Sequence, residues 1–304
     1  MPYFTIFIPT YNRADTLLRA LMSVSTQQDN DLEVVIIDDG STDNSKAIVS
    51  QWQSSVTFPV KYIYQTNQGK TAAHNTMLKH ATGELTVLLD SDDLLTDDAL
   101  STLRHYWEEA KELPDCAGVE CLCADLNSRE LLGTPYPQDR MLSNYLEIRQ
   151  RYDVKGDKLN AIKTSVLQKF PYPRFAGEKH VPPSTVWSRM AHQHNFLHIN
   201  KILKLVEYQS NGISQGWKDK KTRNPCGYRQ YYLEILNGHK RYHSVAELVS
   251  AARRYVYLSL LCGAPFIQQL RDIDNKLLYI ACYPLGAGKY LIQQLKKVGH
   301  NSGG

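Results

Sequence analysis

The sequence predicts an α/β protein with a doubly wound, mostly parallel sheet flanked by helices and a helical C-terminal region. Short apolar segments alternate with amphipathic segments of helical period between residues 3 and 124, which is the rhythm of strands joined by crossover helices. Between residues 225 and 295 the apolar positions recur only at helical spacing. We therefore expect two parts, residues 1–215 with the sheet and residues 216–304 with the C-terminal helices.

The predicted strands are continuous apolar runs that stop at turn residues or acids, as strands buried on both faces do. They are Tyr3–Pro9, Leu32–Asp38, Val60–Tyr64, Thr86–Leu89 and Gly118–Ala124. The segments between them carry apolar residues at helical spacing or begin with helix-capping residues. The predicted helices are Ala14–Gln27, a segment that ends near Trp52, Lys70–His80 and Asp97–Lys111.

The second half of the chain has a weaker pattern. Residues 125–180 are polar and rich in Pro, Tyr and Arg without a clear period, whereas residues 197–209 alternate as strands do. Helices are expected after them at Tyr231–Leu236, Val245–Leu261, Phe266–Ala281 and Lys289–Val298.

Composition is that of a soluble globular protein. The chain has 304 residues, of which 42% are hydrophobic and 22% charged. No apolar run approaches the ~18–20 residues that span a bilayer, and the N-terminus lacks the pattern of a signal peptide. The 6 cysteines are scattered, which favours a reduced, cytoplasmic setting. The net charge of +4, with basic residues concentrated in the C-terminal third, suits an anionic ligand or surface, and no nucleic-acid-binding motif is present.

An acidic cluster follows the apolar run Thr86–Leu89. Asp90, Asp92 and Asp93 come directly after it, with Ser91 between the first two. Ligands of open α/β sheets bind outside the carboxyl ends of the strands, where these acids are expected. Three carboxylates so close together repel one another, and a divalent cation relieves the repulsion. One interpretation is therefore a metal site for a polyphosphate, and the other, equally compatible with the motif alone, is a helix cap with the remaining acids solvated.

Two further features belong to the same sheet edge. Asp38 and Asp39 end another strand, where a carboxylate can accept hydrogen bonds from a nucleobase or ribose, although turn and capping chemistry explains part of this pattern. Gln68-Gly-Lys70-Thr71 does not form a phosphate loop, because position 64 is Tyr where that loop needs Gly. Lys70 either approaches a phosphate as a point charge or is a solvated lysine at a helix start.

These residues occur in the order and spacing typical of family-two glycosyltransferases with the GT-A fold. Five motifs between residues 3 and 110 resemble that family: Pro9–Arg13, Val35–Asp43, Asn67–Lys70, Ala73–Asn75 and Leu89–Asp93. The resemblance implies a sugar transferase of the hexosyltransferase type. It further implies a Rossmann-like sheet, a nucleoside-diphosphate-sugar donor, commonly a UDP-sugar, and Mn²⁺ or Mg²⁺.

The resemblance also implies roles for individual residues. Asp92 is expected to hold the metal with Asp90 near it and near the ribose, and Asp39 is expected to hold the donor's base. The residues expected around the donor are Pro9, Thr10, Tyr11, Arg13, Asp39, Lys70, Asn75, Asp90 and Ser91.

The second half resembles the family more weakly. Phe175–His180 and Trp187–Arg189 look like the segment that supplies the general base in some bacterial members, where a second acid follows; this chain has Val-Pro-Pro-Ser at 181–184. Glu178 is the expected base and His180 the alternative, while an ion pair of Glu178 with a basic neighbour is the structural alternative. Residues 211–214 and the basic run 218–223 resemble a loop that closes over the diphosphate. The alternative interpretation of the basic run is a solvated charged turn.

The predicted function is a metal-dependent, inverting transfer of a sugar to a hydroxyl of a glycan or lipid-linked acceptor in surface polysaccharide synthesis, such as that of a capsule. Residues 285–297 mix apolar and basic side chains, so peripheral contact with the cytoplasmic face of a membrane is one interpretation and ordinary packing the other. Two alternatives compete with the transferase. A sugar-nucleotide nucleotidyltransferase needs a glycine-rich loop that residues 9–13 lack, and a non-catalytic nucleotide-sugar binding module has no need of the acids at 90–93.

Overall fold

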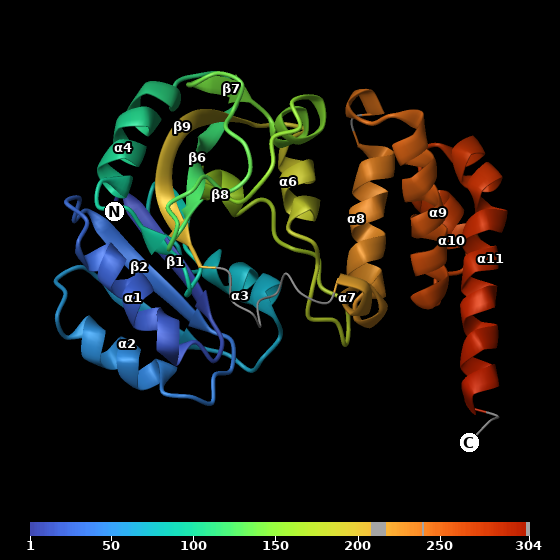
Figure 1. The fold of residues 1–304 in the computed structure, drawn as a ribbon, viewed down its shortest axis with the longest axis horizontal. Coiled ribbons are helices and arrows are strands. Elements are labelled where there is room, and N and C mark those ends of the chain that lie inside the picture. Colours follow the sequence, from blue (N-terminus) through green and yellow to red (C-terminus); the bar gives the residue numbers. More distant parts are fainter. Residues whose placement is uncertain (208–216, 239, 302–304) are drawn as a thin grey trace. The chain divides into compact units, whose positions relative to one another are not determined.

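The computed structural model describes residues 1–207, 217–238 and 240–301, so the expected loop segment 211–214 lies outside the described residues. The chain divides into two compact units, whose elements Figure 1 labels. The first unit comprises Met1–Tyr172 and Gln193–Gln215, and the second comprises Pro173–His192 and Gly216–Gly304.

The first unit is built on a nine-stranded mixed sheet of order β3-β2-β1-β4-β8-β6-β9-β5, with β7 paired to β9. Its strands are β1 (Phe4–Thr10), β2 (Leu32–Asp38), β3 (Val60–Tyr64), β4 (Leu85–Leu88), β5 (Leu94–Leu95), β6 (Cys116–Asp125), β7 (Met141–Ser143), β8 (Lys158–Lys163) and β9 (Asn195–Val206). Strands β3, β2, β1 and β4 are parallel neighbours, and β8 runs antiparallel to both β4 and β6. The expected α/β class is confirmed, and the first four predicted strands lie side by side.

Helices cover this sheet because each places an apolar stripe against it. They are α1 (Ala14–Ser25), α2 (Ser45–Gln53), α3 (Lys70–Met77), α4 (Ala99–Ala110) and the short α5 (Thr164–Leu167), with a π-helical turn at Glu147–Arg151. Leu17 and Leu21 of α1 and Trp107 of α4 are fully buried in the same core as the alternate residues of β1. Helices α1 and α2 lie next to each other, as Figure 1 shows, and α3 packs on β1 and β2.

Strand β8 was not predicted from the sequence. It lies between β4 and β6 in the middle of the sheet, yet it begins with a lysine. The Lys158 ammonium group donates hydrogen bonds to the backbone carbonyls of Thr134 (3.2 Å) and Lys155 (2.7 Å), which allows this polar end to be buried. Those partners are distant in sequence or in a loop, so local periodicity gives no sign of them.

A buried carboxylate on β2 also stabilises this sheet. The Glu33 side chain is 3% exposed and accepts hydrogen bonds from Lys61 Nζ (2.7 Å), Thr5 Oγ1 (2.7 Å), and the backbone N–H (2.7 Å) and hydroxyl (2.8 Å) of Thr82. Burial alone raises the pKa of Glu33, but Lys61 and these hydrogen bonds outweigh burial and hold the pKa below its ordinary value. The negative charge of Glu33 therefore stabilises the fold.

We expect Glu33→Gln to lower the free energy of unfolding by about 3 kcal/mol at pH 7, because an amide NH₂ would then face buried donors. Since the pKa of Glu33 is lowered by folding, its contribution is present above the unfolded pKa and is lost as pH falls through the folded pKa. Urea denaturation at pH 7 and at a series of pH values from about pH 4 downward measures both effects. Glu109→Gln, which removes an exposed ion pair with Arg140, is the control and should cost under about 1 kcal/mol. An equal effect of both substitutions would contradict this account.

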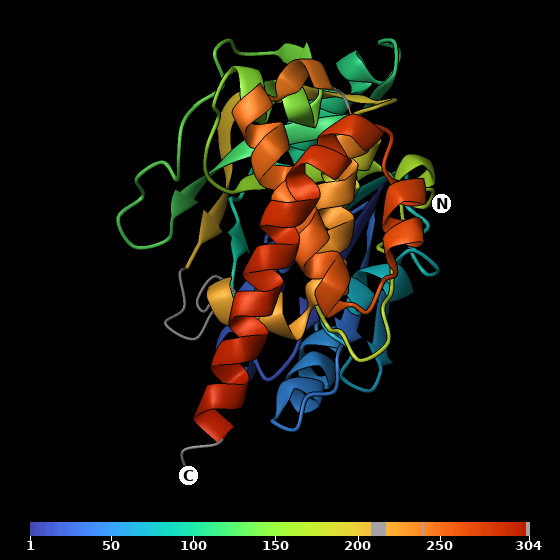
Figure 2. The same ribbon diagram turned by 90° about the vertical axis from the view of Figure 1, so that its right-hand side faces the viewer.

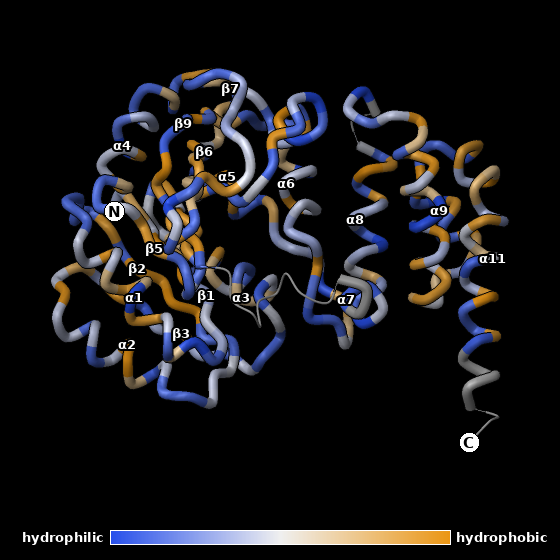
Figure 3. The backbone as a smooth tube through the Cα atoms, in the orientation of Figure 1, coloured by the Kyte–Doolittle hydropathy of each residue, from blue (hydrophilic) through white to orange (hydrophobic). Residues whose placement is uncertain are grey.

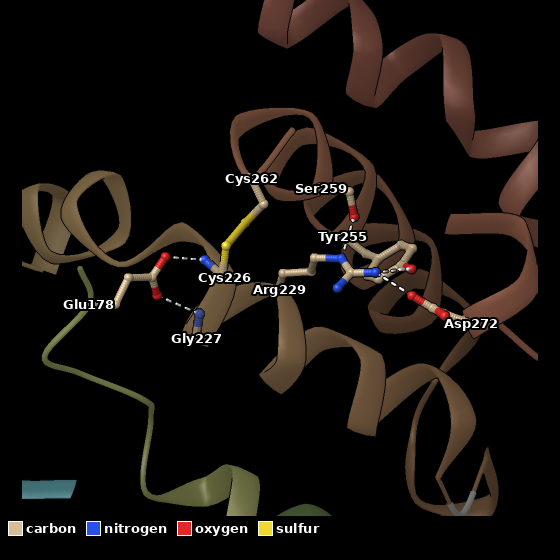
Figure 4. Close-up of a disulfide and its surroundings, with 8 residues drawn as sticks. All are labelled: Glu178, Cys226, Gly227, Arg229, Tyr255, Ser259, Cys262 and Asp272. Carbon is tan, nitrogen blue, oxygen red and sulfur yellow. Dashed lines mark hydrogen bonds and ion pairs between the residues drawn. A yellow bond between two sulfur atoms is a disulfide. The ribbon is translucent and has the colours of Figure 1, made fainter. Parts of the chain in front are cut away.

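The second unit is helical. It contains α6 (Ser184–Met190), α7 (Trp217–Arg223), α8 (Pro225–Asn237), a 3₁₀ turn at Lys240–Tyr242, α9 (Val245–Leu261), α10 (Phe266–Asp272) and α11 (Lys276–Asn301). Helix α9 packs between α8 and α11, as Figures 1 and 2 show. A capping box of Ser244 and Glu247 begins α9. The buried Arg229 of α8 holds the unit together through Ser259 and Tyr255 of α9 and an ion pair with Asp272 of α10 (Figure 4).

Two helix boundaries differ from the sequence prediction. The predicted helix Phe266–Ala281 is broken before Lys276, where Ile273 takes an extended conformation and is fully buried. The predicted gap around Gly286 is instead helical, because α11 runs through Pro284. A Cβ on Gly286 would lie 2.6 Å from Val256 Cβ, so this glycine permits close packing of α11 on α9.

The basic run 218–223 also differs from the expected closing loop, because residues 217–223 form helix α7. Among the described residues, no helix is both long enough and apolar enough to cross a bilayer.

Candidate active site

The order of the sheet reverses between β1 and β4. The chain passes from β1 outward to β2 and β3 and then returns to place β4 on the other side of β1, with all four strands parallel. In such sheets, the loops that leave the two central strands diverge and leave a crevice at the carboxyl end. Residues 9–13 follow β1 and residues 90–93 follow β4, so the fold brings two predicted groups of site residues to this switch point.

The acids after β4 each face a different cation. Asp90 pairs with Lys70 Nζ (2.5 Å), Asp92 with Arg13 Nε (3.7 Å), and Asp93 with the buried Lys204 Nζ (2.6 Å). Burial and the negative charge of Asp90 raise the pKa of Asp92 and outweigh the attraction of Arg13 and Lys70. Among the three pairs, the contact between Asp92 and Arg13 is the longest, so Asp92 has the weakest direct ion pair of this group.

This arrangement fits a hard divalent cation on chemical grounds. Carboxylate oxygens suit Mg²⁺ and Mn²⁺, and a cation beside Asp92 would relieve its repulsion with Asp90. The side chains of both residues are partly exposed, at 23% for Asp92 and 37% for Asp90, so their oxygens are accessible. Ser91 between them is buried.

Asp39 anchors the loop that precedes Lys70. Its carboxylate accepts hydrogen bonds from Gln65 Nε2 (2.6 Å), Gln68 N (3.0 Å) and Gly69 N (2.7 Å), and the residue is 4% exposed. Gly69 has a positive φ of 90°, which lets the loop turn into α3 and sets Lys70 at the helix start, beside Asp90. Asp39 thus fixes the position of Lys70, and its contact with the donor's base stays a prediction.

The turn after β1 is tied to the loop after β2. Asn12, with a φ of 49°, accepts a hydrogen bond from Thr42 N (2.8 Å), and Asp43 accepts one from Ala14 N (2.9 Å). Tyr11 is 48% exposed at this turn, as suits a ring that stacks on a ligand. Next to it, the hydroxyl of Thr10 is buried and has no hydrogen-bond partner among the described residues. Pro9 is partly buried at the end of the strand.

Asn75 is engaged by the protein itself. Its side-chain amide donates to the backbone carbonyl of Tyr172 and accepts from the Tyr172 N–H, both at 2.8 Å. The neighbouring His74 ring lies 4.7 Å from the Phe7 ring and 5.4 Å from the Tyr172 ring. Burial, followed by the charge of Lys70, lowers the pKa of His74 to about 3, so this imidazole is neutral at pH 7. Tyr172 thus contacts both Asn75 and His74, and donor contact by Asn75 stays a prediction.

Lys204 is the residue of this region that the sequence analysis missed. It lies on β9, and its side chain is 8% exposed where it meets Asp93. Two lysines occur in β9, and the available signal was that either of them, if buried, requires a carboxylate partner.

The two predicted bases lie in the second unit. Glu178 accepts hydrogen bonds from the backbone N–H groups of Cys226 (2.7 Å) and Gly227 (2.8 Å), so it caps the first turn of α8 (Figure 4). Burial raises the pKa of Glu178 and outweighs these two hydrogen bonds. The His180 ring lies 5.7 Å from the Tyr228 ring, and its backbone N–H donates to Asn224 Oδ1 (3.0 Å). This capping role was not predicted from the sequence.

A doubly wound sheet with carboxylates and basic side chains at its switch point is typical of nucleotide-binding α/β enzymes. Comparison with known proteins narrows the class. The model of glycosyl transferase family 2 matches residues 5–157, about half of the chain. The protein belongs to this family, and it is a glycosyltransferase.

Individual relatives of the chain are also glycosyltransferases. The GalNAc(5)-diNAcBac-PP-undecaprenol beta-1,3-glucosyltransferase of Campylobacter jejuni is 28% identical over 77% of this chain and 73% of that protein. An uncharacterized glycosyltransferase of Nostoc sp. is 44% identical over 38% of this chain, a stretch that covers only 34% of the relative.

Solved structures share the fold. S. aureus TarS 1–349 in complex with UDP-GlcNAc has a TM-score of 0.63 at 19% identity and covers 95% of this chain and 80% of that chain. The mannosyltransferase PcManGT from Pyrobaculum calidifontis, in complex with GDP-Man and Mn²⁺, has a TM-score of 0.54 at 20% identity and covers 96% of this chain and 85% of that chain. These likenesses confirm the expected GT-A fold.

Proposed function

We propose that the protein is a metal-dependent, inverting glycosyltransferase that uses a UDP-sugar and a hydroxyl of a glycan or lipid-linked acceptor. The observation that carries the proposal is the acidic cluster at the β1/β4 switch point, where Asp92 and its cationic partner Arg13 are 3.7 Å apart, farther than the partners of Asp90 and Asp93. The TarS complex with UDP-GlcNAc and the PcManGT complex with Mn²⁺ support the choice of donor and metal. The undecaprenol-linked substrate in the name of the Campylobacter relative supports a lipid-linked acceptor.

We assign each of the predicted site residues a role in a single displacement at the anomeric carbon of the donor sugar. Asp92, with Asp90, would hold the cation, which when bound stabilises the charge of the leaving diphosphate. Lys70 carries a positive charge at the start of α3 and would neutralise a donor phosphate. Tyr11 would stack on the base and Asp39 would bind its imide. Pro9, Thr10 and Arg13 complete the turn that surrounds them.

The acceptor needs a base. We propose Glu178, whose raised pKa brings it closer to the operating pH of a cytoplasmic enzyme. The acceptor oxygen forms a bond to the anomeric carbon while the bond from that carbon to the diphosphate oxygen breaks. The electron pair leaves with the nucleoside diphosphate and the hydroxyl proton passes to Glu178. One displacement inverts the anomeric configuration.

One observation favours a second candidate. Both oxygens of Glu178 are already occupied by backbone N–H groups, as in a purely structural cap. The second candidate is therefore a non-catalytic nucleotide-sugar binding module, which would bind the donor without turnover.

Calorimetric titration with UDP, with and without Mn²⁺, tests the donor site. We expect binding that requires the metal. Release of UDP from a UDP-sugar in the presence of a lipid-linked saccharide then separates transferase from binding module. Metal-independent UDP binding would contradict the proposed role of Asp92.

Helix α11 supports the proposed contact with a membrane. Six of its exposed side chains are large and apolar: Leu277, Ile280, Leu285, Leu291, Ile292 and Leu295, with exposed fractions of 53–82%. At about 100° per residue they share one face of the helix, and hydrophobic residues recur along α11 in Figure 3. The helix contains lysines but no Asp or Glu. We propose that this face rests on the anionic cytoplasmic surface of a membrane.

We expect the double substitution Leu291→Glu and Leu295→Glu to weaken binding to vesicles of anionic lipid by about tenfold or more. Co-sedimentation at fixed ionic strength measures the bound fraction. The double substitution Leu18→Glu and Met22→Glu, which places the same two charges at exposed apolar residues of α1, is the control and should bind as wild type does. Wild-type protein that does not sediment with anionic vesicles would exclude this contact.

A further inference from the structure

The segment that carries both predicted bases is clamped to the start of α8. Besides the two hydrogen bonds to Glu178, the backbone N–H groups of Lys179 and His180 both donate to Asn224 Oδ1 at 3.0 Å. A Cβ on Gly227 would lie 2.4 Å from the His180 carbonyl oxygen, so the two backbones lie in direct contact. The conformation of residues 178–180 therefore depends on the first turn of α8.

A disulfide lies within this clamp. Cys226, one of the residues whose N–H binds Glu178, is joined to Cys262, which follows the last residue of α9 (Figure 4). A carboxylate oxygen of Glu178 and both sulfur atoms lie within 4.8 Å of one another. The bond thus links the first turn of α8 to the end of α9 directly beside the carboxylate.

The position of this pair indicates that it can change its redox state. Cys226 and Cys262 are only partly buried, and Cys262 is followed by the exposed Gly263. The other cysteines, Cys116, Cys121, Cys123 and Cys282, are buried and free. Since reactive cysteines are accessible ones, exchange would be selective for this pair.

We propose that Cys226 and Cys262 form a reversible thiol–disulfide site that sets how firmly residues 178–180 are held on α8. The oxidant is a low-molecular-weight disulfide such as oxidised glutathione. The Cys226 thiolate attacks one sulfur of it and expels a thiolate, and the Cys262 thiolate then attacks Cys226 Sγ and expels the second. Two protein thiols are oxidised by two electrons, the small disulfide is reduced to two thiols, and the protons lost by the cysteines are taken up by the released thiolates.

The two states differ at the clamp for two reasons. The disulfide tethers the residue that donates to Glu178, and reduction removes this tether. A thiolate at position 226 would also place a second negative charge near the Glu178 carboxylate, which repels it, whereas the disulfide is neutral. The oxidised protein therefore holds residues 178–180 firmly and the reduced protein holds them loosely.

Hydrogen exchange measured by mass spectrometry on the full chain tests this proposal without relying on activity. Oxidised and reduced glutathione set the two states, and thiol alkylation reports them. We expect peptides that cover residues 174–183 and 224–228 to exchange about tenfold faster in the reduced protein. Cys226→Ser and, independently, Cys262→Ser should exchange at the fast rate under both conditions. Cys282→Ser, which removes a buried free thiol of the same unit, should respond as wild type does.

Three results would overturn the proposal. One is formation of the bond by oxidised glutathione without a change in exchange at residues 174–183, and another is failure of oxidised glutathione to form the bond at all. Reduced protein that takes up one equivalent of Zn²⁺ and then resists oxidation would make the pair a metal site instead.

The catalytic consequence rests on the proposed function. If Glu178 is the base, kcat should differ between the two redox states of wild type and of Cys282→Ser, but not of Cys226→Ser. A protein without transferase activity that still shows the redox-dependent exchange would refute the base and keep the thiol–disulfide site. A protein with transferase activity whose hydrogen exchange does not depend on redox state would refute the thiol–disulfide site and leave the proposed base unaffected.

Discussion

Replacing Asp92 with asparagine is expected to lower kcat/KM for the UDP-sugar about a thousandfold, which corresponds to about 4 kcal/mol of lost transition-state stabilisation. The substitution keeps the size of the side chain and removes the charge that a divalent cation needs. The Mn²⁺-dependent part of UDP binding should disappear in the same variant. Steady-state kinetics and calorimetric titration measure the two effects.

The control for this variant is Asp97→Asn. Asp97 is an exposed carboxylate of the same acidic stretch, and the ion pairs of Lys70, Arg13 and Lys204 in this group are made with other acids. It should keep both activity and metal-dependent binding. An Asp92→Asn protein with unchanged metal dependence would exclude Asp92 as the ligand and direct attention to Asp90.

The second large effect is expected for Glu178→Gln, which should lower kcat by a factor of about 100–10,000 and leave UDP binding intact. Because folding raises the pKa of Glu178, wild-type activity should fall as pH drops through a value above that of an ordinary glutamate, where the base becomes protonated. The pH profile of kcat/KM should lose this acidic limb in the variant.

The profile also separates the base from a structural cap. A glutamine still caps α8 with its oxygen, so a purely structural role predicts a modest loss of stability and an unchanged pH profile. Glu234→Gln, another carboxyl group of the second unit with a raised pKa, is the matched control and should retain activity. Loss of activity in His180→Asn together with an active Glu178→Gln would identify His180 as the base.

Several elements could be predicted closely because local interactions decide them. Strands β2 and β3 have the predicted bounds, and β1, β4 and α9 agree within a residue or two. In each of these elements the apolar residues follow a single strand or helix pattern, and turn or capping residues lie at its ends. Residues close in sequence are therefore sufficient to predict its bounds. The acidic cluster could also be predicted, because ligands bind at the carboxyl ends of the strands in parallel sheets, and this holds independently of residues far away in the sequence.

The C-terminal boundaries illustrate the limit of that approach. The predicted helices left a gap at residues 282–288, but close packing of Gly286 on Val256 favours a continuous α11. Tight packing on α9 outweighs the local preference for a break, and only the folded unit contains that contact.

What the sequence by itself determined is the α/β class, the parallel strands of the first unit and the acids at their ends. Only the tertiary structure decided which charges meet. Lys204 reaches Asp93 across 111 positions of sequence, and Glu178 reaches the amides of α8 across 48 and 49. The pairing of Cys226 with Cys262 follows from the same folding of α8 against α9. A buried charge or a cysteine pairs with whichever group the folded chain places within bonding distance. The number of residues between two groups in the sequence does not predict their distance in the folded protein.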